Sequence, residues 1–329
     1  MTRLLIFDAA WKRVAGELAP FKDRLQVLLV DRDGQITLDG KPVDVDSAQP
    51  EIAWASGEMY SSGASRNFMI AALKSDALKW VHSGAAGFDH PVFRQLVEKG
   101  VRLTNSHGQA ISIAEYVLAE VLGYLQHLQK RREEQAAHRW TRLPFREVMG
   151  SRWLVVGFGA IGQAVAERAG GFGAKITGVR RNQAAHPLAE RIAPLSQAAT
   201  LAAEADVVVL SPPLTAETRG LADAAFFAAM KPGSIFVNVG RGGLVDEPAL
   251  LAALDKGVPE HAILDVFATE PLPADSPFWD HPKVSLTPHA SAFGSGNAAR
   301  NDEAFVENVR RYLAGEPLIS EVARQDVLA

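Results

Sequence analysis

Six short apolar runs between residues 153 and 286 constrain the fold of this chain more than any other feature. Helical stretches, several of them rich in alanine, separate most of these runs. Strands that alternate with helices predict crossover connections and a parallel sheet. The runs are WLVV, KITGV, DVVVL, SIFVN, AILDV and KVSL. Six strands joined by crossovers are what a complete dinucleotide-binding domain requires, so we expect a doubly wound α/β domain here.

The first third of the chain shows the same alternation. Its candidate strands are Leu4–Phe7, Gln26–Leu29, Ile52–Ala55, Trp80–His82 and Arg102–Thr104, and its candidate helices include Asn67–Leu73 and Pro91–Glu98. A long helical pattern over 111–131 leads into the second series, and another leads out of it after Ser295. We therefore predict two Rossmann-like or flavodoxin-like parallel-sheet domains. The outer domain would comprise 1–106 plus 294–329, the inserted domain 107–293, and the active site would lie in the cleft between them.

Composition narrows the class of protein. The chain has 329 residues, 47% of them hydrophobic, which is enough to form two hydrophobic cores. Its net charge is −4, so the composition gives no sign of a basic surface that would bind nucleic acid or an anionic membrane. It contains no cysteine, which excludes disulfides, thiolate metal sites and a cysteine nucleophile. The N-terminal MTRLLIFDAAWKR is typical of a first strand rather than a signal peptide or membrane span. A cytoplasmic protein without a metal site is expected.

One glycine-rich turn follows the first of the six runs. Gly157, Gly159 and Gly162 are spaced as G-x-G-x-x-G between WLVV and the helical stretch IGQAVAERA. In such a motif the first glycine permits a tight turn, the second lets backbone N–H groups approach a pyrophosphate, and the third allows a helix to pack closely on a strand. With Ala160 and Ile161, these positions predict a dinucleotide site. The alternative is a glycine-rich turn without a ligand.

The residues after the second run bear on the choice of dinucleotide. A site selective for NAD usually places Asp or Glu about 20 residues after the glycines, to bind the ribose 2′-hydroxyl. Here KITGV is followed by Arg180 and Arg181. Two guanidinium groups could hold a 2′-phosphate, and no carboxylate is present to repel it. We predict that NADP(H) is preferred over NAD(H); the alternative is a pair of solvated surface arginines.

Three ionisable side chains follow later strands of the same half. Arg241 comes directly after SIFVNVG, Glu270 lies in the loop after AILDV, and His289 follows KVSL. Because ligands bind at the carboxyl ends of strands in doubly wound sheets, all three are expected at one edge. Reduction of a 2-oxo acid needs a cation for the carboxylate and a proton donor for the carbonyl oxygen. Arginine suits the first task, histidine suits the second, and a glutamate can orient the imidazole.

Each of these residues also has a purely structural interpretation. Arg241 could be a surface arginine at the start of a helix, although its glycine neighbours indicate a loop that another group approaches closely. Glu270 could be an exposed acid of a turn, and His289 could be a hydrogen-bonded histidine at the end of a strand. The local sequence leaves these alternatives open.

Several segments, taken in order, resemble the D-isomer-specific 2-hydroxyacid dehydrogenase family. They are GFGAIG, PPLTAETRGL, MKPGSIFVNVGRGGLVDEPAL, LDVFATEPLP and LTPHAS, and the resemblance covers essentially the whole chain. It implies an NAD(P)-dependent D-2-hydroxyacid dehydrogenase. In this family the position of Arg241 binds the substrate carboxylate and carbonyl, that of His289 is the acid/base, and that of Glu270 is its partner. Asp265 and Pro213 would contact the cofactor.

The resemblance extends to the outer domain. SGAAGFD looks like the family's substrate loop, in which backbone N–H groups at Ala85, Ala86 and Gly87 would hold the substrate carboxylate. SPFWDHPKVSLTPH resembles the NADPH-using glyoxylate/hydroxypyruvate reductases, which implies a small 2-oxo or 2-hydroxy acid as substrate. Trp54 and Met59 are expected in an outer-domain loop that lines the substrate pocket.

The resemblance further implies a homodimer. Trp140 lies in a region that in relatives can reach toward the partner subunit, and plain interface packing is the other interpretation. Two rival functions stay open. One is a formate or phosphite dehydrogenase of the same superfamily, although formate-oxidising relatives carry Gln in place of Glu270. The other is a dinucleotide-sensing, corepressor-like binding protein, which would not need the Arg–Glu–His set.

Overall fold

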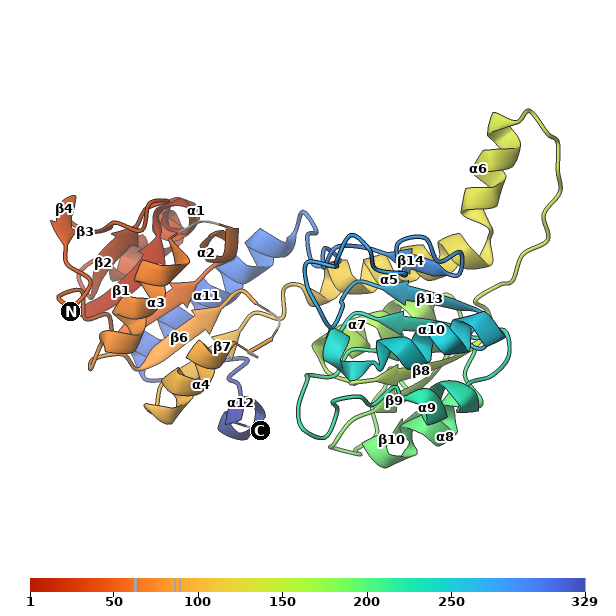
Figure 1. Ribbon diagram of the computed structural model, residues 1–329. Coiled ribbons are helices and arrows are strands. Elements are labelled where there is room, and N and C mark those ends of the chain that lie inside the picture. The colour runs from red at the N-terminus through yellow and green to blue at the C-terminus, as the bar shows by residue number, and fades with distance from the viewer. Residues whose placement is uncertain (62–63, 86, 89, 329) are drawn as a thin grey trace. The chain divides into compact units, whose positions relative to one another are not determined.

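The structure, a computed structural model, describes residues 1–61, 64–85, 87–88 and 90–328. The chain forms two compact units (Figure 1). Unit 1 comprises residues 1–109 and 295–329, and unit 2 comprises residues 110–294. The chain therefore passes between the units twice, at 109–110 and at 294–295. The boundaries predicted from the sequence, 106 and 294, lie within about three residues of these points.

Unit 1 is built on a seven-stranded sheet in the order β4-β3-β2-β1-β5-β6-β7. Its strands are β1 (Thr2–Phe7), β2 (Leu25–Val30), β3 (Ile36–Leu38), β4 (Lys41–Val43), β5 (Ile52–Ala55), β6 (Trp80–Ser83) and β7 (Arg102–Asn105). Five strands are parallel and follow the flavodoxin-like order. At one edge of this parallel sheet, β3 and β4 pair antiparallel, and the sequence did not predict these two strands. Both are three-residue strands and β4 contains a proline, so neither produces a recognisable apolar run.

The helices of unit 1 include the three predicted from the sequence. They are α1 (Asp8–Leu18), the 3₁₀ helix η1 (Ala19–Phe21), α2 (Gly57–Ser61), α3 (Ser65–Lys74), α4 (Pro91–Glu98), α11 (Asn297–Ala314) and α12 (Arg324–Leu328). Helix α11 contributes the buried Phe305 and Val309 to the core of unit 1, although both are far from the rest of that core in the sequence. The C-terminal segment is therefore an integral part of this unit.

An aromatic stack joins α11 to the sheet of unit 1. The ring centroid of Phe305 lies 4.1 Å from that of Trp54 and 5.9 Å from that of Trp80, and both pairs are stacked. All three side chains are fully buried. This corrects the prediction for Trp54, which lies in β5 and not in a loop that lines a substrate pocket. Because β5 lies between β1 and β6, its side chains are buried on both faces of the sheet. Met59 is likewise buried, in α2.

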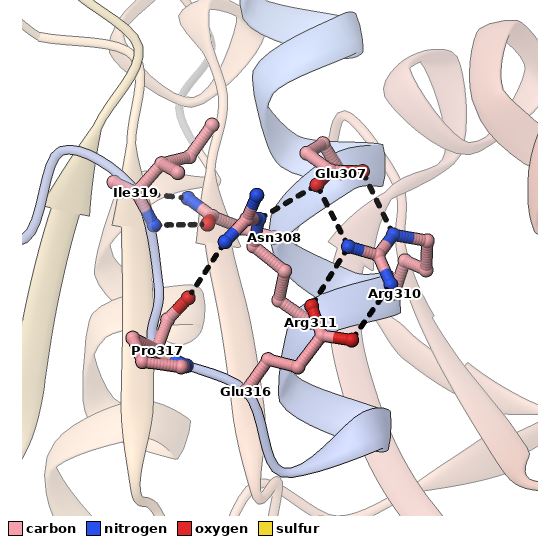
Figure 2. Close-up of polar contacts among 7 residues, drawn as sticks. All are labelled: Glu307, Asn308, Arg310, Arg311, Glu316, Pro317 and Ile319. Atoms are coloured by element: carbon pink, nitrogen blue, oxygen red, sulfur yellow. Dashed lines mark hydrogen bonds and ion pairs between the residues drawn. The ribbon is translucent and has the colours of Figure 1, made fainter.

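Polar contacts fasten the C-terminal tail to α11 (Figure 2). The side-chain amide of Asn308 donates to the carbonyl of Ile319 at 3.0 Å and accepts from its N–H at 2.8 Å. Arg310 contacts the carboxylates of both Glu307 and Glu316 at 2.9 Å. Hydrogen bonds from Arg310 and from the next arginine lower the pKa of Glu307 to about 2, so this carboxylate stays charged in the folded protein.

Unit 2 is built on a fully parallel seven-stranded sheet in the order β10-β9-β8-β11-β12-β13-β14. Its strands are β8 (Arg152–Val156), β9 (Lys175–Val179), β10 (Arg191–Ala193), β11 (Val207–Leu210), β12 (Ile235–Asn238), β13 (His261–Leu264) and β14 (Val284–Leu286). This is the dinucleotide-binding order 3-2-1-4-5-6 with a seventh strand added at one edge. The six predicted strands are present. The strand that the sequence analysis missed is β10, which has only three residues, whereas the strand beyond the dinucleotide-binding order is β14.

Helices cover both faces of the sheet of unit 2 (Figure 1). They are α5 (Ala110–Leu125), α6 (Leu128–Ala136), α7 (Ala160–Gly171), α8 (Ala198–Ala202), α9 (Ala224–Ala229) and α10 (Glu247–Lys256), with the 3₁₀ helices η2 (Leu195–Gln197) and η3 (Gly242–Leu244). Alternate strand residues face opposite layers: Val155 packs with α5 and α7, whereas Leu154 and Val156 pack with α8, α9 and α10. The fold class predicted from the sequence is thereby confirmed.

The long helix predicted over 111–131 is interrupted. Helix α5 ends at Leu125, and His127 takes a left-handed backbone conformation with φ of 54° before α6 begins. Helix α6 is almost wholly polar, and it extends away from the sheet of unit 2 (Figure 1). Throughout the part of the chain that the structure describes, no helix is both long and apolar enough to span a bilayer.

Candidate active site

The strands of unit 2 end in register at one edge of the sheet. Their last residues pair in a single row: Val156, Val179, Leu210, Asn238, Leu264 and Leu286. Most of the predicted functional residues follow this row at once. Gly157 and Arg180 come directly after two of the strands, and Arg241 and His289 come three residues after two others. Parallel pairing therefore brings the glycine turn and the candidate catalytic residues to the same edge, as the sequence predicted.

The three glycines of the turn have different surroundings. Gly157 has φ of +91°, and a Cβ there would lie 2.3 Å from the backbone nitrogen of Pro212. A Cβ on Gly162 would lie 2.4 Å from the carbonyl oxygen of Gly157. Packing within the unit therefore requires glycine at both positions. A Cβ on Gly159, by contrast, would meet no atom of the described chain within 4 Å.

Gly159 is also the N-cap residue of α7, and no side chain caps this helix. Ala160 and Ile161 are the first residues of α7, so their amides lie at its positive end. An open space next to a helix N-terminus fits the pyrophosphate of a dinucleotide. Pro213 is exposed in the loop after β11, and its carbonyl accepts a hydrogen bond of 2.6 Å from Thr218 Oγ1.

The two arginines after β9 differ in their contacts. The guanidinium of Arg180 donates to the carbonyls of Asn182 at 2.7 Å and Ala184 at 2.8 Å. Arg180 thus stabilises its own loop. Arg181 has an exposed side chain in the same loop. Both lie just beyond the row of strand ends.

Arg241 begins a tightly packed loop. A Cβ on Gly242 would lie 1.9 Å from the backbone carbon of Phe267, so only glycine fits beside Arg241. The side-chain amide of Asn238 donates to the carbonyl of Arg241 at 3.0 Å and accepts from the N–H of Gly240 at 3.1 Å. The Arg241 guanidinium donates to the carbonyl of Gly240 at 2.7 Å. Hydrogen bonds to Gly240 and to Arg241 itself therefore fix the backbone that carries the Arg241 guanidinium.

Glu270 and His289 form a pair. His289 Nδ1 lies 2.7 Å from Glu270 Oε2, and Glu270 Oε1 accepts the N–H of Phe267 at 2.9 Å. Because a carboxylate only accepts hydrogen bonds, Nδ1 carries the proton of this contact. Among the residues described, none hydrogen-bonds with Nε2. The side chains are 46% and 36% exposed, so the imidazole is accessible.

Asp265 holds the loop that carries His289. Its carboxylate accepts hydrogen bonds from Thr287 Oγ1 at 2.7 Å, from the N–H groups of Ala290 at 2.8 Å and Ser291 at 3.1 Å, and from the hydroxyl of Ser291. Its main-chain carbonyl accepts the N–H of His289 at 2.8 Å. Asp265 is 1% exposed. Its carboxylate is therefore fully engaged by its own chain, which the expectation of a cofactor contact did not foresee.

The predicted substrate loop of unit 1 is partly described. Ala86 lies outside the described residues. The N–H of Ala85 donates to Ser83 Oγ at 3.1 Å, so in this structure it is not available for the predicted contact with a substrate carboxylate. Gly87 is partly exposed. In the described ranges, no cluster of three or more His, Asp or Glu side chains is placed to hold a metal ion.

Several residues around the His289 loop were not predicted. Thr287 and Ser291 flank His289 two residues away on either side, and the hydroxyls of TPHAS could have suggested this role. Tyr116 and Ser112 could not have been found this way. Their hydroxyls contact the loop from α5, about 170 residues earlier in the chain, and no local pattern encodes such a contact.

Known proteins share the sequence pattern and the fold of this chain. The pattern of the family described as D-isomer specific 2-hydroxyacid dehydrogenase, NAD binding domain, matches residues 118–291. Among curated proteins, the chain is 38% identical to D-3-phosphoglycerate dehydrogenase from Mycobacterium leprae over 242 residues, which are 73% of this chain and 46% of that protein. The chain thus spans about half the length of the first of the curated relatives that it matches. It is 34% identical to glyoxylate/hydroxypyruvate reductase B from Pectobacterium atrosepticum over 282 residues, 81% of this chain and 85% of that protein.

A solved structure extends the similarity to both units. It is a D-isomer specific 2-hydroxyacid dehydrogenase from Xanthobacter autotrophicus in complex with NADPH and MES. Its TM-score is 0.77 at 29% sequence identity, with 98% of each chain covered.

Proposed function

Because the chain belongs to the D-isomer-specific 2-hydroxyacid dehydrogenase family, we propose that it reduces a small 2-oxo acid to the D-2-hydroxy acid with NADPH. The observation that carries this proposal is the 2.7 Å pair of His289 and Glu270. It stands on the sheet edge that also carries Arg241 and the glycine turn. A scaffold or sensor protein would have no use for an accessible, carboxylate-oriented imidazole beside a dinucleotide site.

The roles of the residues follow from their chemistry. Arg241 binds the carboxylate and carbonyl of the 2-oxo acid, because its guanidinium can form two parallel hydrogen bonds. His289 holds a proton on Nε2 and delivers it to the carbonyl oxygen, while Glu270 keeps the imidazole oriented through Nδ1. The reduced nicotinamide, when bound, supplies the hydride. Arg241 and the imidazolium stabilise the developing alkoxide charge, a contribution on the order of several kcal/mol in such sites.

The glycine turn and the arginines would hold the cofactor. The amides of Ala160 and Ile161 at the start of α7 suit the pyrophosphate, and Pro213 would border the same site. Arg180 and Arg181 suit a 2′-phosphate, with Arg180 also shaping the loop. The NADPH complex of the Xanthobacter relative supports this preference. Asp265 would act beside the nicotinamide by fixing the His289 loop.

The proposed substrate is of the glyoxylate or hydroxypyruvate type. The 34% identity to glyoxylate/hydroxypyruvate reductase B, over 85% of that protein, supports this class of substrate. In unit 1, the backbone N–H of Gly87 is the proposed contact for the substrate carboxylate.

A panel of substrates tests this function. We expect glyoxylate and hydroxypyruvate to be reduced, with kcat/KM at least about tenfold higher for NADPH than for NADH. The measurement is the loss of reduced-cofactor absorbance, with formate and D-3-phosphoglycerate assayed in the oxidative direction. Faster turnover of either of these, or a preference for NADH, would contradict the proposal in that respect. Cofactor binding without turnover of any 2-oxo acid would favour the sensor function.

We further propose that the protein is a homodimer assembled through an arm formed by α6 and residues 137–147. The arm exposes Trp140 to 96% and Phe145 to 49%, an apolar content that suits burial against a second copy. Sedimentation should give a dimer, and Trp140→Ser should raise the dissociation constant by roughly tenfold or more. A wild-type monomer at micromolar concentration would refute the proposal.

A further inference from the structure

Helix α5 contacts the His289 loop through two hydroxyls on one of its faces. Ser112 and Tyr116 are four residues apart, so their side chains lie on the same side of the helix. Ser112 Oγ donates to the carbonyl of Ala292 at 3.2 Å, and Tyr116 Oη lies 3.0 Å from Thr287 Oγ1. A Cβ on Gly294 would lie 2.4 Å from that of Ser112. Helix α5 therefore supports the loop on both sides of His289.

The directions of these hydrogen bonds can be assigned. Thr287 Oγ1 lies 2.7 Å from Asp265 Oδ1 as well as 3.0 Å from Tyr116 Oη. A carboxylate only accepts, so the single hydroxyl proton of Thr287 points to Asp265. Tyr116 must then donate to Thr287. Burial raises the pKa of Tyr116, so its phenol remains a donor across the working pH range.

The loop needs such support because its backbone is unusual. His289 has φ of +51°, a left-handed conformation that is costly for a residue with a side chain. Such a backbone conformation persists where contacts with neighbouring residues hold the loop in place. Asp265 provides most of these contacts, and the Tyr116–Thr287 pair fixes one side of the Asp265 carboxylate. Each donor in such a chain strengthens the next bond.

We propose that Tyr116 is a positioning residue for the acid/base His289, acting through Thr287 and Asp265. The proposal rests on the proposed function only for the role of His289; the support of the loop is a property of the chain itself. Tyr116 acts without touching the reactants. Its hydroxyl keeps the imidazole at the position where Nε2 meets the carbonyl oxygen.

Tyr116→Phe removes the hydroxyl and keeps the ring. We expect kcat for the 2-oxo acid to fall by roughly 3- to 10-fold, the range expected for one buried hydrogen bond. KM for NADPH should not change, because the glycine turn is untouched. The matched control is Tyr124→Phe, two turns further along α5. Its hydroxyl lies 2.8 Å from Glu260, next to the start of β13 at the opposite edge of the sheet, so kcat should not change.

A double-mutant cycle tests whether Tyr116 acts on His289 through Thr287. Thr287→Val should lower kcat at least as much as Tyr116→Phe, and Thr287→Ser, which keeps the hydroxyl, should retain more activity than Thr287→Val. The double variant Tyr116→Phe/Thr287→Val should be no slower than Thr287→Val alone, because Tyr116 then has no acceptor to act on. Additive losses, or equal losses in Tyr116→Phe and Tyr124→Phe, would overturn the proposal.

Hydrogen exchange gives a readout that does not depend on turnover. The amides of Ala290 and Ser291 donate to Asp265, so they should exchange faster in Tyr116→Phe and at the wild-type rate in Tyr124→Phe. Unchanged exchange in Tyr116→Phe would overturn the positioning role. If the wild type reduces no 2-oxo acid, the proposed function fails, and the exchange comparison still decides whether Tyr116 supports the loop.

Discussion

Replacing His289 with glutamine should lower kcat for the 2-oxo acid by roughly 100-fold or more. Glutamine can keep a side-chain N–H near Glu270, but it cannot hold and deliver a proton at the position of Nε2. The affinity for NADPH should stay within about twofold, because His289 and the glycine turn follow different strands. Steady-state kinetics and a fluorescence titration with NADPH measure the two quantities. Near-normal turnover would remove His289 from the proposed chemistry.

Arg241→Gln serves as the comparison for this variant. It should raise KM for the 2-oxo acid as well as lower kcat, because the guanidinium binds the substrate before and during the reaction. His289→Gln should act mainly on kcat. If both variants changed kcat and KM in the same proportion, the division of roles between cation and acid/base would be wrong.

Replacing Gly159 with alanine should raise the dissociation constant of NADPH by roughly 30-fold or more while the melting temperature stays unchanged. A Cβ at Gly159 meets no atom of the described chain within 4 Å, so the fold tolerates it. The same Cβ would occupy the space through which a pyrophosphate approaches the start of α7. Differential scanning fluorimetry and an NADPH titration separate the two effects.

Alanine variants of two other glycines serve as controls for Gly159→Ala. Gly170 lies on the same helix, its Cβ would also meet open space, and Gly170→Ala should leave NADPH affinity unchanged without lowering the melting temperature. Gly157→Ala should lower the melting temperature, because the Cβ would lie 2.3 Å from the backbone of Pro212 at a residue with φ of +91°. Normal NADPH affinity in Gly159→Ala would mean that the pyrophosphate does not bind at this turn.

Local patterns were enough to predict both sheets and the edge where the site lies. The runs WLVV and SIFVN are each long enough to identify a buried strand, and the register of parallel strands then carries Gly157, Arg241 and His289 to one edge. Three strands were missed. Strands β3, β4 and β10 have three residues each, and the periodicity of so short a segment cannot be distinguished from that of a loop.

The sequence did not predict the surroundings of two of the candidate residues. Trp54 was expected in a loop that lines the substrate pocket, but it lies in β5, inside the sheet, and α11, about 250 residues later, stacks Phe305 against it. Arg180 reads as a free cation, but two carbonyls of its own loop accept its N–H groups. Burial depends on segments that are distant in the chain, so local composition does not encode it.

By itself, the sequence of this protein determined its two α/β sheets, its glycine turn and the Arg–Glu–His set, because strand periodicity and motif spacing are properties of neighbouring residues. The contacts by which Asp265 holds the His289 loop, and by which Tyr116 reaches it from α5, became visible in the folded protein alone. Both depend on the directions of hydrogen bonds between segments brought together by folding. The 3.0 Å contact between Tyr116 and Thr287 depends on the position of the two hydroxyls in space, and the spacing of residues along the chain does not specify that position.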